Sequence, residues 1–132
     1  MKKSYLNKIG KSQTAKMKNK CDKLCTPVIK KLFPLCESCG QPTQVAHHWI
    51  EKSRSNRLRY DIKNLIPLCN TCHCKIHNRF GASIVGCLDV SDIIRNKRGE
   101  DWYNEIRQLS KESVKTDIIF YHKSFEYLES LL

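Results

Sequence analysis

Residues 69–77 read CNTCHCKIH, which places three cysteines and two histidines within nine positions. Cysteine thiolates and histidine imidazoles are the side chains with which proteins most often bind zinc and related transition metals. So many of these ligands on one short stretch predict a metal site. The surrounding sequence decides how many metals are held and by which residues.

The chain has 132 residues and eight cysteines. This length allows one domain with a modest hydrophobic core. No stretch approaches the roughly 18 consecutive apolar residues that span a membrane, and no apolar run follows the lysine-rich N-terminus as a secretory signal requires. We therefore expect a cytoplasmic protein without membrane contact. Its thiols stay reduced there, so CxxC pairs bind metal rather than form disulfides.

Two such pairs are present, and they predict one closed site. Cys36 and Cys39 are separated by two residues, and so are Cys69 and Cys72. This spacing lets one tight turn present two sulfurs to the same ion, and two turns together complete a tetrahedral four-cysteine site. A closed site of this kind is structural, so the sequence predicts a structural Zn²⁺.

Charge is distributed unevenly along the chain. Residues 1–31 carry ten lysines and a single acid, Asp22, whereas residues 81–132 have a net charge of −2. A basic front half favours a polyanionic partner, and nucleic acid is the obvious one because each neutralised phosphate releases counterions. Charge alone leaves open a basic tail that only keeps the protein in solution.

The N-terminal third predicts a basic arm followed by a helix. Residues 1–13 lack a sustained apolar period and suggest a flexible arm. Residues 14–33 have apolar side chains at three- and four-residue spacing, which predicts a helix that Pro27 kinks or splits. Cys21 and Cys25 lie one turn apart on its apolar side. We interpret them as small core residues, because no further cysteine pair remains to complete a second thiolate site.

The rest of the chain predicts a hairpin and further helices. VAHHWI (45–50) and NLIPLC (64–69) suggest an irregular β-hairpin, followed by a helix to about Arg79 that Gly81 ends. Helices follow to the C-terminus, the last one capped by Thr116. We expect a single domain composed of a basic arm and helix (1–33), a metal-binding core (34–80) and C-terminal helices packed on the core (81–132).

Four histidines in the core suggest a second metal. His73 and His77 are four residues apart on the predicted helix, so their imidazoles share one face. His47 and His48 are neighbours on a predicted strand and therefore point to opposite sides. One of this pair would complete a three-histidine site with an open coordination position, and the other would stand nearby as a base.

The order of these residues resembles the HNH, or ββα-metal, nuclease motif. The resemblance is carried by HH at 47–48, Asn64, His73, and the two cysteine pairs CESC and CNTC, which support the motif in many HNH proteins. The resemblance implies an α+β fold with a small ββα-metal core braced by the four-cysteine zinc site. It implies that His48 is the general base, and that Asn64 holds the loop and orients His48. It also implies that His47, His73 and His77 bind a catalytic Mg²⁺ or another divalent cation. In some branches the asparagine is itself a ligand, so Asn64 and His77 are alternatives for one position.

A wider stretch is similar to the phage recombination endonucleases of the NinG/Rap type. A basic helix leads into CESCG, then AHHWIEKSRSNRLRYDIKNLIPLCNTCHCKIH, and later GEDWYNEI. This similarity implies a DNA endonuclease that cuts branched recombination intermediates in the cytoplasm of the phage's host. Cutting both strands needs two active sites, which would make a homodimer useful. The alternatives are a non-catalytic zinc-binding module for nucleic acid and a protein-interaction domain.

Four cations separate the predicted base from Asn64 and predict contacts to DNA. We expect them to hold backbone phosphates with weak sequence preference, whereas the alternative is an ordinary solvated loop. The four residues are Lys52, Arg54, Arg57 and Arg59.

Overall fold

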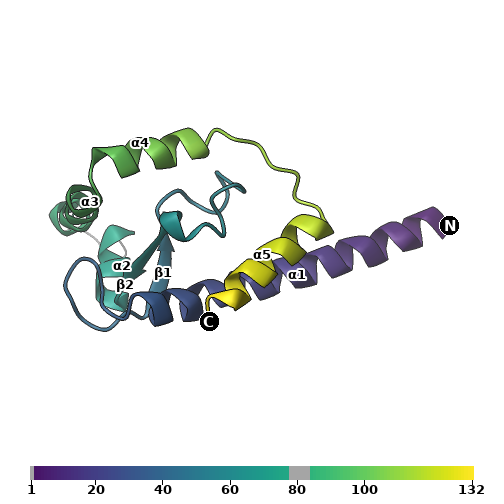
Figure 1. The fold of residues 1–132 in the computed structure, drawn as a ribbon, viewed down its shortest axis with the longest axis horizontal. Helices are drawn as coiled ribbons and strands as arrows, with labels where there is room; N and C mark the ends of the chain where they lie inside the picture. Colours follow the sequence, from purple (N-terminus) through teal and green to yellow (C-terminus); the bar gives the residue numbers. More distant parts are fainter. Residues whose placement is uncertain (1, 78–83) are drawn as a thin grey trace.

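The structure is a computed structural model that describes residues 2–77 and 84–132, with side chains described for residues 13–77 and 90–132. Five α-helices, two strands and one 3₁₀ turn are present in these ranges (Figure 1). In chain order they are α1 (Lys2–Leu32), β1 (Val45–His48), the 3₁₀ turn η1 (Ile62–Asn64), β2 (Leu65–Leu68), α2 (Asn70–Ile76), α3 (Ile84–Arg98), α4 (Glu100–Leu109) and α5 (Ile118–Ser130).

The two strands form the predicted antiparallel hairpin and divide the fold into two sides. His47 pairs with Ile66, and His48 pairs with Leu65. Because side chains alternate along a strand, each such pair lies on one face of the sheet. His48 therefore shares the face of Leu65, and His47 shares the opposite face with Ile66.

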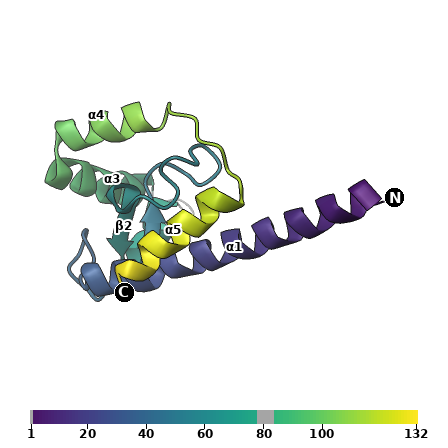
Figure 2. The ribbon, with the colours of Figure 1, turned by 45° about the vertical axis from the view of Figure 1, so that its right-hand side comes forward.

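The first face is covered by α1, and α5 packs along α1 (Figures 1 and 2). Apolar side chains recurring every three to four residues on α1 bury one side of this helix, while Leu65 contributes from the sheet. This core therefore links the N-terminal and C-terminal helices to the hairpin. Its buried residues are Cys21, Cys25, Val28, Ile29, Ala46, Tyr60, Leu65, Tyr121 and Leu128.

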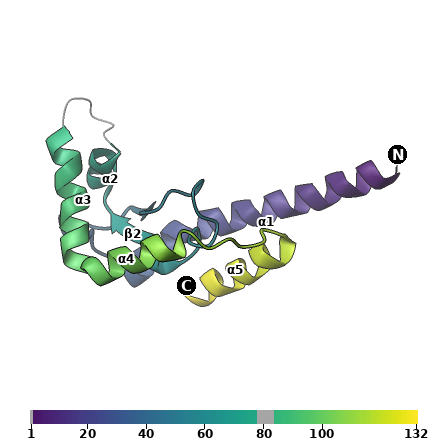
Figure 3. The same ribbon diagram turned by 90° about the horizontal axis from the view of Figure 1, so that it is seen from above.

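The second face is covered by α2, on which α3 packs (Figure 3). Ile66 and Leu68 of the sheet meet Val90 and Ile94 of α3 here, together with three of the four predicted zinc-ligand cysteines. The corner between α3 and α4 is fastened to η1, because Trp102 Nε1 donates a hydrogen bond of 2.9 Å to the Lys63 carbonyl. The architecture confirms the predicted α+β class with a small ββα core.

The structure corrects one prediction for α1 and excludes one of the two alternatives in another. The helix begins at Lys2 and includes residues 2–13, for which a flexible arm was predicted. Extending a helix that already exists adds one hydrogen bond per residue without a new nucleation cost, so weak periodicity is sufficient there. Pro27 does not split the helix. The lost hydrogen bond and ring clash cost roughly 3 kcal/mol, but the fully buried Val28 and Ile29 follow directly and offset this by about 1.5–3 kcal/mol each.

Helix ends differ from the predictions at two further places. The N-cap of α5 is Asp117 rather than Thr116, since the Asp117 carboxylate accepts a hydrogen bond of 2.9 Å from Phe120 N. Helix α2 ends at Ile76, with His77 as its C-cap. The predicted stop at Gly81 lies outside the described residues. Among the described helices, none is long and apolar enough to cross a membrane.

Candidate metal centre

The four-cysteine cluster predicted from the two CxxC pairs is present. The ligand atoms of these cysteines lie within 4.8 Å of one another, and Cys39 Sγ is 3.6 Å from Cys69 Sγ. Four sulfurs at about 2.3 Å from a tetrahedral zinc are about 3.8 Å apart, so the observed spacing matches this geometry. The cluster is therefore suited to a structural zinc. Its members are Cys36, Cys39, Cys69 and Cys72.

Local backbone structure prepares the first turn, and the sulfur of Cys36 in particular, for this role. Gly40, with φ of 79°, closes the first turn by donating from its N–H to the Cys36 carbonyl. Burial alone raises the pKa of Cys36, but hydrogen bonds from the backbone amides of Cys39, Cys69 and Ser38 outweigh it and lower the pKa to about 7. Cys36 therefore has substantial thiolate character, and the thiolate is the form that binds zinc.

Cys21 and Cys25 are core residues, as predicted, and belong to neither candidate metal group in the described part of the chain. The Cys21 thiol donates to the Tyr121 carbonyl at 3.3 Å, and burial raises its pKa to about 11. Burial also raises the pKa of Cys25 to about 12. Both therefore remain neutral thiols. The side chain of Cys87 lies outside the described residues.

Three histidines form a second group. His47 comes from β1, and His73 and His77 come from α2, whose helical spacing aligns the last two. The ligand atoms of the group lie within 4.8 Å of one another, and the Nε2 atoms of His73 and His77 are 3.0 Å apart. Two nitrogens bound at about 2.1 Å to one cation are separated by about 3.0–3.4 Å. The group can therefore share a single divalent cation.

The electrostatics of His47 suit a metal ligand. Burial, followed by the neighbouring imidazoles of His77 and His73, lowers the pKa of His47 to about 3. Its ring is therefore neutral at neutral pH, and a neutral imidazole has the lone pair that metal binding needs.

His48 lies on the other face of the strand and does not join this group. Its Nε2 is 2.9 Å from the Arg59 carbonyl, which can only accept a hydrogen bond, so Nε2 carries the proton. The lone pair is then on Nδ1. Burial, with smaller contributions from the charges of Lys52 and Arg59, lowers the pKa of His48 to about 4. At neutral pH His48 is therefore an uncharged imidazole able to accept a proton.

Asn64 is fully buried, and both ends of its amide are engaged within the loop that joins the strands. Oδ1 accepts a hydrogen bond of 2.7 Å from Ile50 N, while Nδ2 donates to the Ile50 carbonyl at 3.0 Å and the Leu58 carbonyl at 3.4 Å. Asn64 therefore closes the loop at its base.

All four histidines open onto one cleft. A cavity of about 460 Å³ is lined by the three-histidine group and His48, together with Asp22 and Thr26 of α1 and with Lys52. An adjoining hollow of about 230 Å³ shares His47, His48 and His77. The cleft thus combines a candidate metal group with a separate candidate base.

The predicted phosphate contacts are placed unequally. Lys52 is exposed and lines the cleft. Arg54 is exposed and makes only a loose ion pair of 3.6 Å with Glu51. Arg57 is paired with Asp61 and Glu112. Arg59 is held by the Asp22 carboxylate at 2.9–3.0 Å with its side chain only 12% exposed, which speaks against a phosphate contact.

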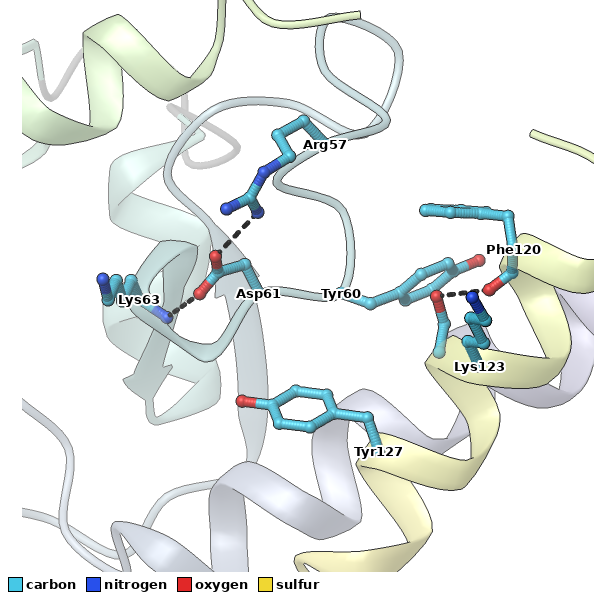
Figure 4. Close-up of a pocket in the computed structure, with 8 residues that line it drawn as sticks. Arg57, Tyr60, Asp61, Lys63, Phe120, Lys123 and Tyr127 are labelled. Atoms are coloured by element: carbon cyan, nitrogen blue, oxygen red, sulfur yellow. Dashed lines mark hydrogen bonds and ion pairs between the residues drawn. The ribbon is translucent and has the colours of Figure 1, made fainter. Parts of the chain in front are cut away.

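Another cavity, of about 450 Å³, lies between the 57–63 segment and α5, and no histidine lines it (Figure 4). Tyr60, Phe120 and Tyr127 provide aromatic walls. Two of the three basic groups here have acidic partners, since Arg57 binds Asp61 and Lys63 binds Glu105, whereas no acid among the described residues pairs with Lys123. Unlike the histidine cleft, the cavity is lined by no candidate metal group of the described residues.

Asp22 is the residue of this region that the sequence analysis did not identify. It comes from α1, yet it lines the histidine cleft and accepts hydrogen bonds from Arg59 and Tyr60. The signal in the sequence was its isolation, because it is the single acid among ten lysines in residues 1–31.

Comparison with known proteins gives a family for this part of the chain. Residues 36–79, which contain both candidate metal groups, match the model of the HNH endonuclease family. A segment of 55 residues is 42% identical to the mitochondrial DNA mismatch repair protein mutS homolog of Sarcophyton glaucum. The match covers 39% of this chain and only 6% of that protein, so the chain spans a small part of its length. No solved structure matches the chain.

Proposed function

We propose that this chain, with its HNH endonuclease domain at residues 36–79, is a metal-dependent endonuclease that hydrolyses phosphodiester bonds in DNA. One observation carries the proposal. Neighbouring residues of a single strand direct one histidine to a three-histidine group and the other to a separate position, and both open onto the same cleft. A bound cation and a base beside it together supply what hydrolysis of a phosphodiester can use: stabilisation of the developing charge and activation of the attacking water.

The residues act as follows in this proposal. His48 Nδ1 takes a proton from the attacking water, while its Nε2–H stays bonded to the Arg59 carbonyl. His47, His73 and His77 would hold the divalent cation. When bound, this cation would offset the negative charge that develops on the phosphate and the leaving 3′ oxygen. Lys52 and Arg54 contact backbone phosphates beside the cleft.

We assign the disputed ligand position to His77 and not to Asn64. The Asn64 carbonyl oxygen already accepts a short hydrogen bond from Ile50 N, and its NH₂ group donates twice. Turning this oxygen towards a metal would leave buried backbone groups unsatisfied, at a cost of about 1–3 kcal/mol each. Asn64 instead holds the loop whose Arg59 carbonyl orients His48.

The substrate is proposed to be branched recombination intermediates of phage DNA, acted on in the host cytoplasm. This substrate assignment rests on the resemblance of a wider stretch, which includes the HNH domain, to the phage recombination endonucleases of the NinG/Rap type. The name of the mismatch repair relative is consistent with DNA as the polymer. Cutting both strands of a junction would need a homodimer. The alternative function is a zinc-binding module that binds nucleic acid without cutting it.

Cleavage assays test this function. Labelled four-way-junction DNA and matched linear duplex would be incubated with the full chain and Mg²⁺ or Mn²⁺, with EDTA as the metal-free control. We expect metal-dependent cutting, faster on the junction. Equal cleavage rates on both DNAs would rule out a preference for branched DNA but would still support the proposed nuclease activity. Binding of both DNAs without cutting under either metal would favour the non-catalytic module.

The exposed lysines of α1 are expected to carry part of the DNA affinity. At about 100° per residue, Lys16, Lys20 and Lys23 lie on one side of the helix, and Lys23 is about 60° from Thr26, which lines the cleft. All three are exposed. A duplex in the cleft would therefore pass beside this row.

Replacing these three lysines with glutamine should weaken duplex binding and flatten its salt dependence. Each lost phosphate contact lowers the slope of log K against log salt by about 0.9, so we expect a decrease of about 2–3. The measurement is fluorescence anisotropy at several salt concentrations. Glutamine at Lys111, Lys115 and Lys123 removes the same charge and should leave the slope nearly unchanged. Equal losses in both triple variants would show that only total charge matters.

A further inference from the structure

We propose that Asp22 of α1 is a positioning residue that fixes His48 as the base, by holding the segment whose carbonyl binds His48 Nε2. This inference rests on the proposed role of His48. It adds a residue from outside the family-matched segment 36–79 to the working site.

The contacts run through one continuous chain. The Asp22 carboxylate accepts hydrogen bonds from Arg59 Nε at 3.0 Å and Arg59 Nη2 at 2.9 Å, and a third from the Tyr60 hydroxyl at 2.9 Å. The carbonyl of the same Arg59 accepts from His48 Nε2 at 2.9 Å. One carboxylate thus anchors two consecutive residues, the first of which orients the imidazole.

This anchoring complements that of Asn64. Asn64 Nδ2 donates to the Leu58 carbonyl, directly before Arg59 in the chain. The turn that contains the 59–60 peptide is closed by Asp61 N, which donates to the Leu58 carbonyl at 3.1 Å. The side chains of Arg59 and Tyr60 extend from this turn, and both donate to Asp22. The Arg59 carbonyl selects the His48 tautomer. The segment that carries this carbonyl is therefore held both by Asn64, within the domain, and by Asp22, on α1.

Asp22 is not available as a base or metal ligand itself. Burial raises its pKa, but the hydrogen bonds from Arg59 and Tyr60 outweigh this and lower the pKa below its ordinary value. Its carboxylate is thus ionised, and three donors occupy its two oxygens. It acts through its neighbours.

A matched ion pair elsewhere in the chain separates positioning from stability. Glu37 binds Arg98 Nε at 2.9 and 3.0 Å, and the two side chains are 20% and 17% exposed. The corresponding values for Asp22 and Arg59 are 22% and 12%. Glu37→Ala therefore removes a comparable half-buried carboxylate without touching the segment that holds His48.

The experiment compares Asp22→Ala and Glu37→Ala in the zinc-loaded full chain. Both should lower the thermal midpoint by similar amounts. Asp22→Ala should lower kcat for DNA cleavage about 10-fold or more with little change in KM, because an unoriented base loses part of its usual 10²–10⁴-fold contribution. Glu37→Ala should keep kcat within about 2-fold. Asp22→Asn retains one acceptor oxygen and should give an intermediate kcat.

A second readout does not depend on cleavage. Long-range ¹H–¹⁵N spectra of histidine-labelled protein should show the Nε2–H tautomer for His48 in the wild type and in Glu37→Ala, and a tautomer mixture in Asp22→Ala. If Asp22→Ala does not fold, Arg59→Lys, which keeps the charge but loses the two-point contact, is measured in its place.

Unchanged kcat and an unchanged tautomer in a folded Asp22 variant would overturn the proposal. Equal losses of kcat in the Asp22 and Glu37 variants would do the same, since the effect would then follow stability alone. If the wild type does not cut DNA, the proposed function fails by itself, and the tautomer comparison still decides whether Asp22 positions His48.

Discussion

Replacing Cys72 with serine is expected to abolish the cooperative fold of this chain. A structural zinc site contributes on the order of 10 kcal/mol to folding, which is comparable to the roughly 5–15 kcal/mol of a whole domain. The cluster also joins the turn before the hairpin to the start of α2, because Cys36 and Cys39 precede the hairpin, whereas Cys69 and Cys72 open α2. Loss of one thiolate should separate α2 from the hairpin.

Circular dichroism during heating and Co²⁺ spectra are the measurements. The wild type should unfold cooperatively and, with Co²⁺, show the charge-transfer bands of thiolate coordination. Cys72→Ser should lose the thiolate bands and the cooperative transition. Cys74→Ser is the matched control, because Cys74 lies two positions away on α2 and outside both metal groups. A Cys72 variant that kept the wild-type transition would contradict a structural role for this cluster.

Replacing His48 with alanine should lower the cleavage rate by about 10²–10⁴-fold while preserving the fold and both metal groups. His48 lies on the opposite face of β1 from His47, so its removal leaves the three-histidine group intact. Single-turnover cleavage with saturating Mg²⁺ or Mn²⁺ would measure the chemical step, and metal content would be determined on the same samples.

Two comparisons sharpen this test. His122→Ala removes an exposed histidine of α5, far along the chain from the cleft residues, and should cut at the wild-type rate. His47→Ala should lose both cleavage and the second metal, whereas His48→Ala should lose cleavage alone. Full activity in His48→Ala would refute its assignment as the base.

Much of the centre was predictable because its geometry is local. Two residues between cysteines force two sulfurs into one turn, and four residues between histidines align them on one helix face, whatever the remaining fold. The alternation of a strand likewise predicted that His47 and His48 would separate. The four-cysteine group, the hairpin and the α+β class all followed from such short-range rules, and the structure confirms them.

The failures concern weak local signals and long-range partners. Residues 2–13 suggested a flexible arm because they lack an apolar stripe, yet the helix that begins there needs no stripe of its own once the buried part of α1 exists. Arg59 was predicted to contact phosphate from its charge alone, because the sequence did not reveal the carboxylate that pairs with it. That partner, Asp22, is 37 positions away in the sequence.

The sequence by itself therefore determined which side chains can bind metal and the local turns, strand and helix that present them. Only the tertiary structure decided that His47 faces α2 and His48 faces α1. It also decided that the Asn64 amide hydrogen-bonds within its own loop, and that Asp22 binds Arg59, whose carbonyl contacts the proposed base. The reason is physical: ligand spacing is set by bond geometry over a few residues, whereas the partners of His48 depend on which helix buries its apolar side against that face of the sheet.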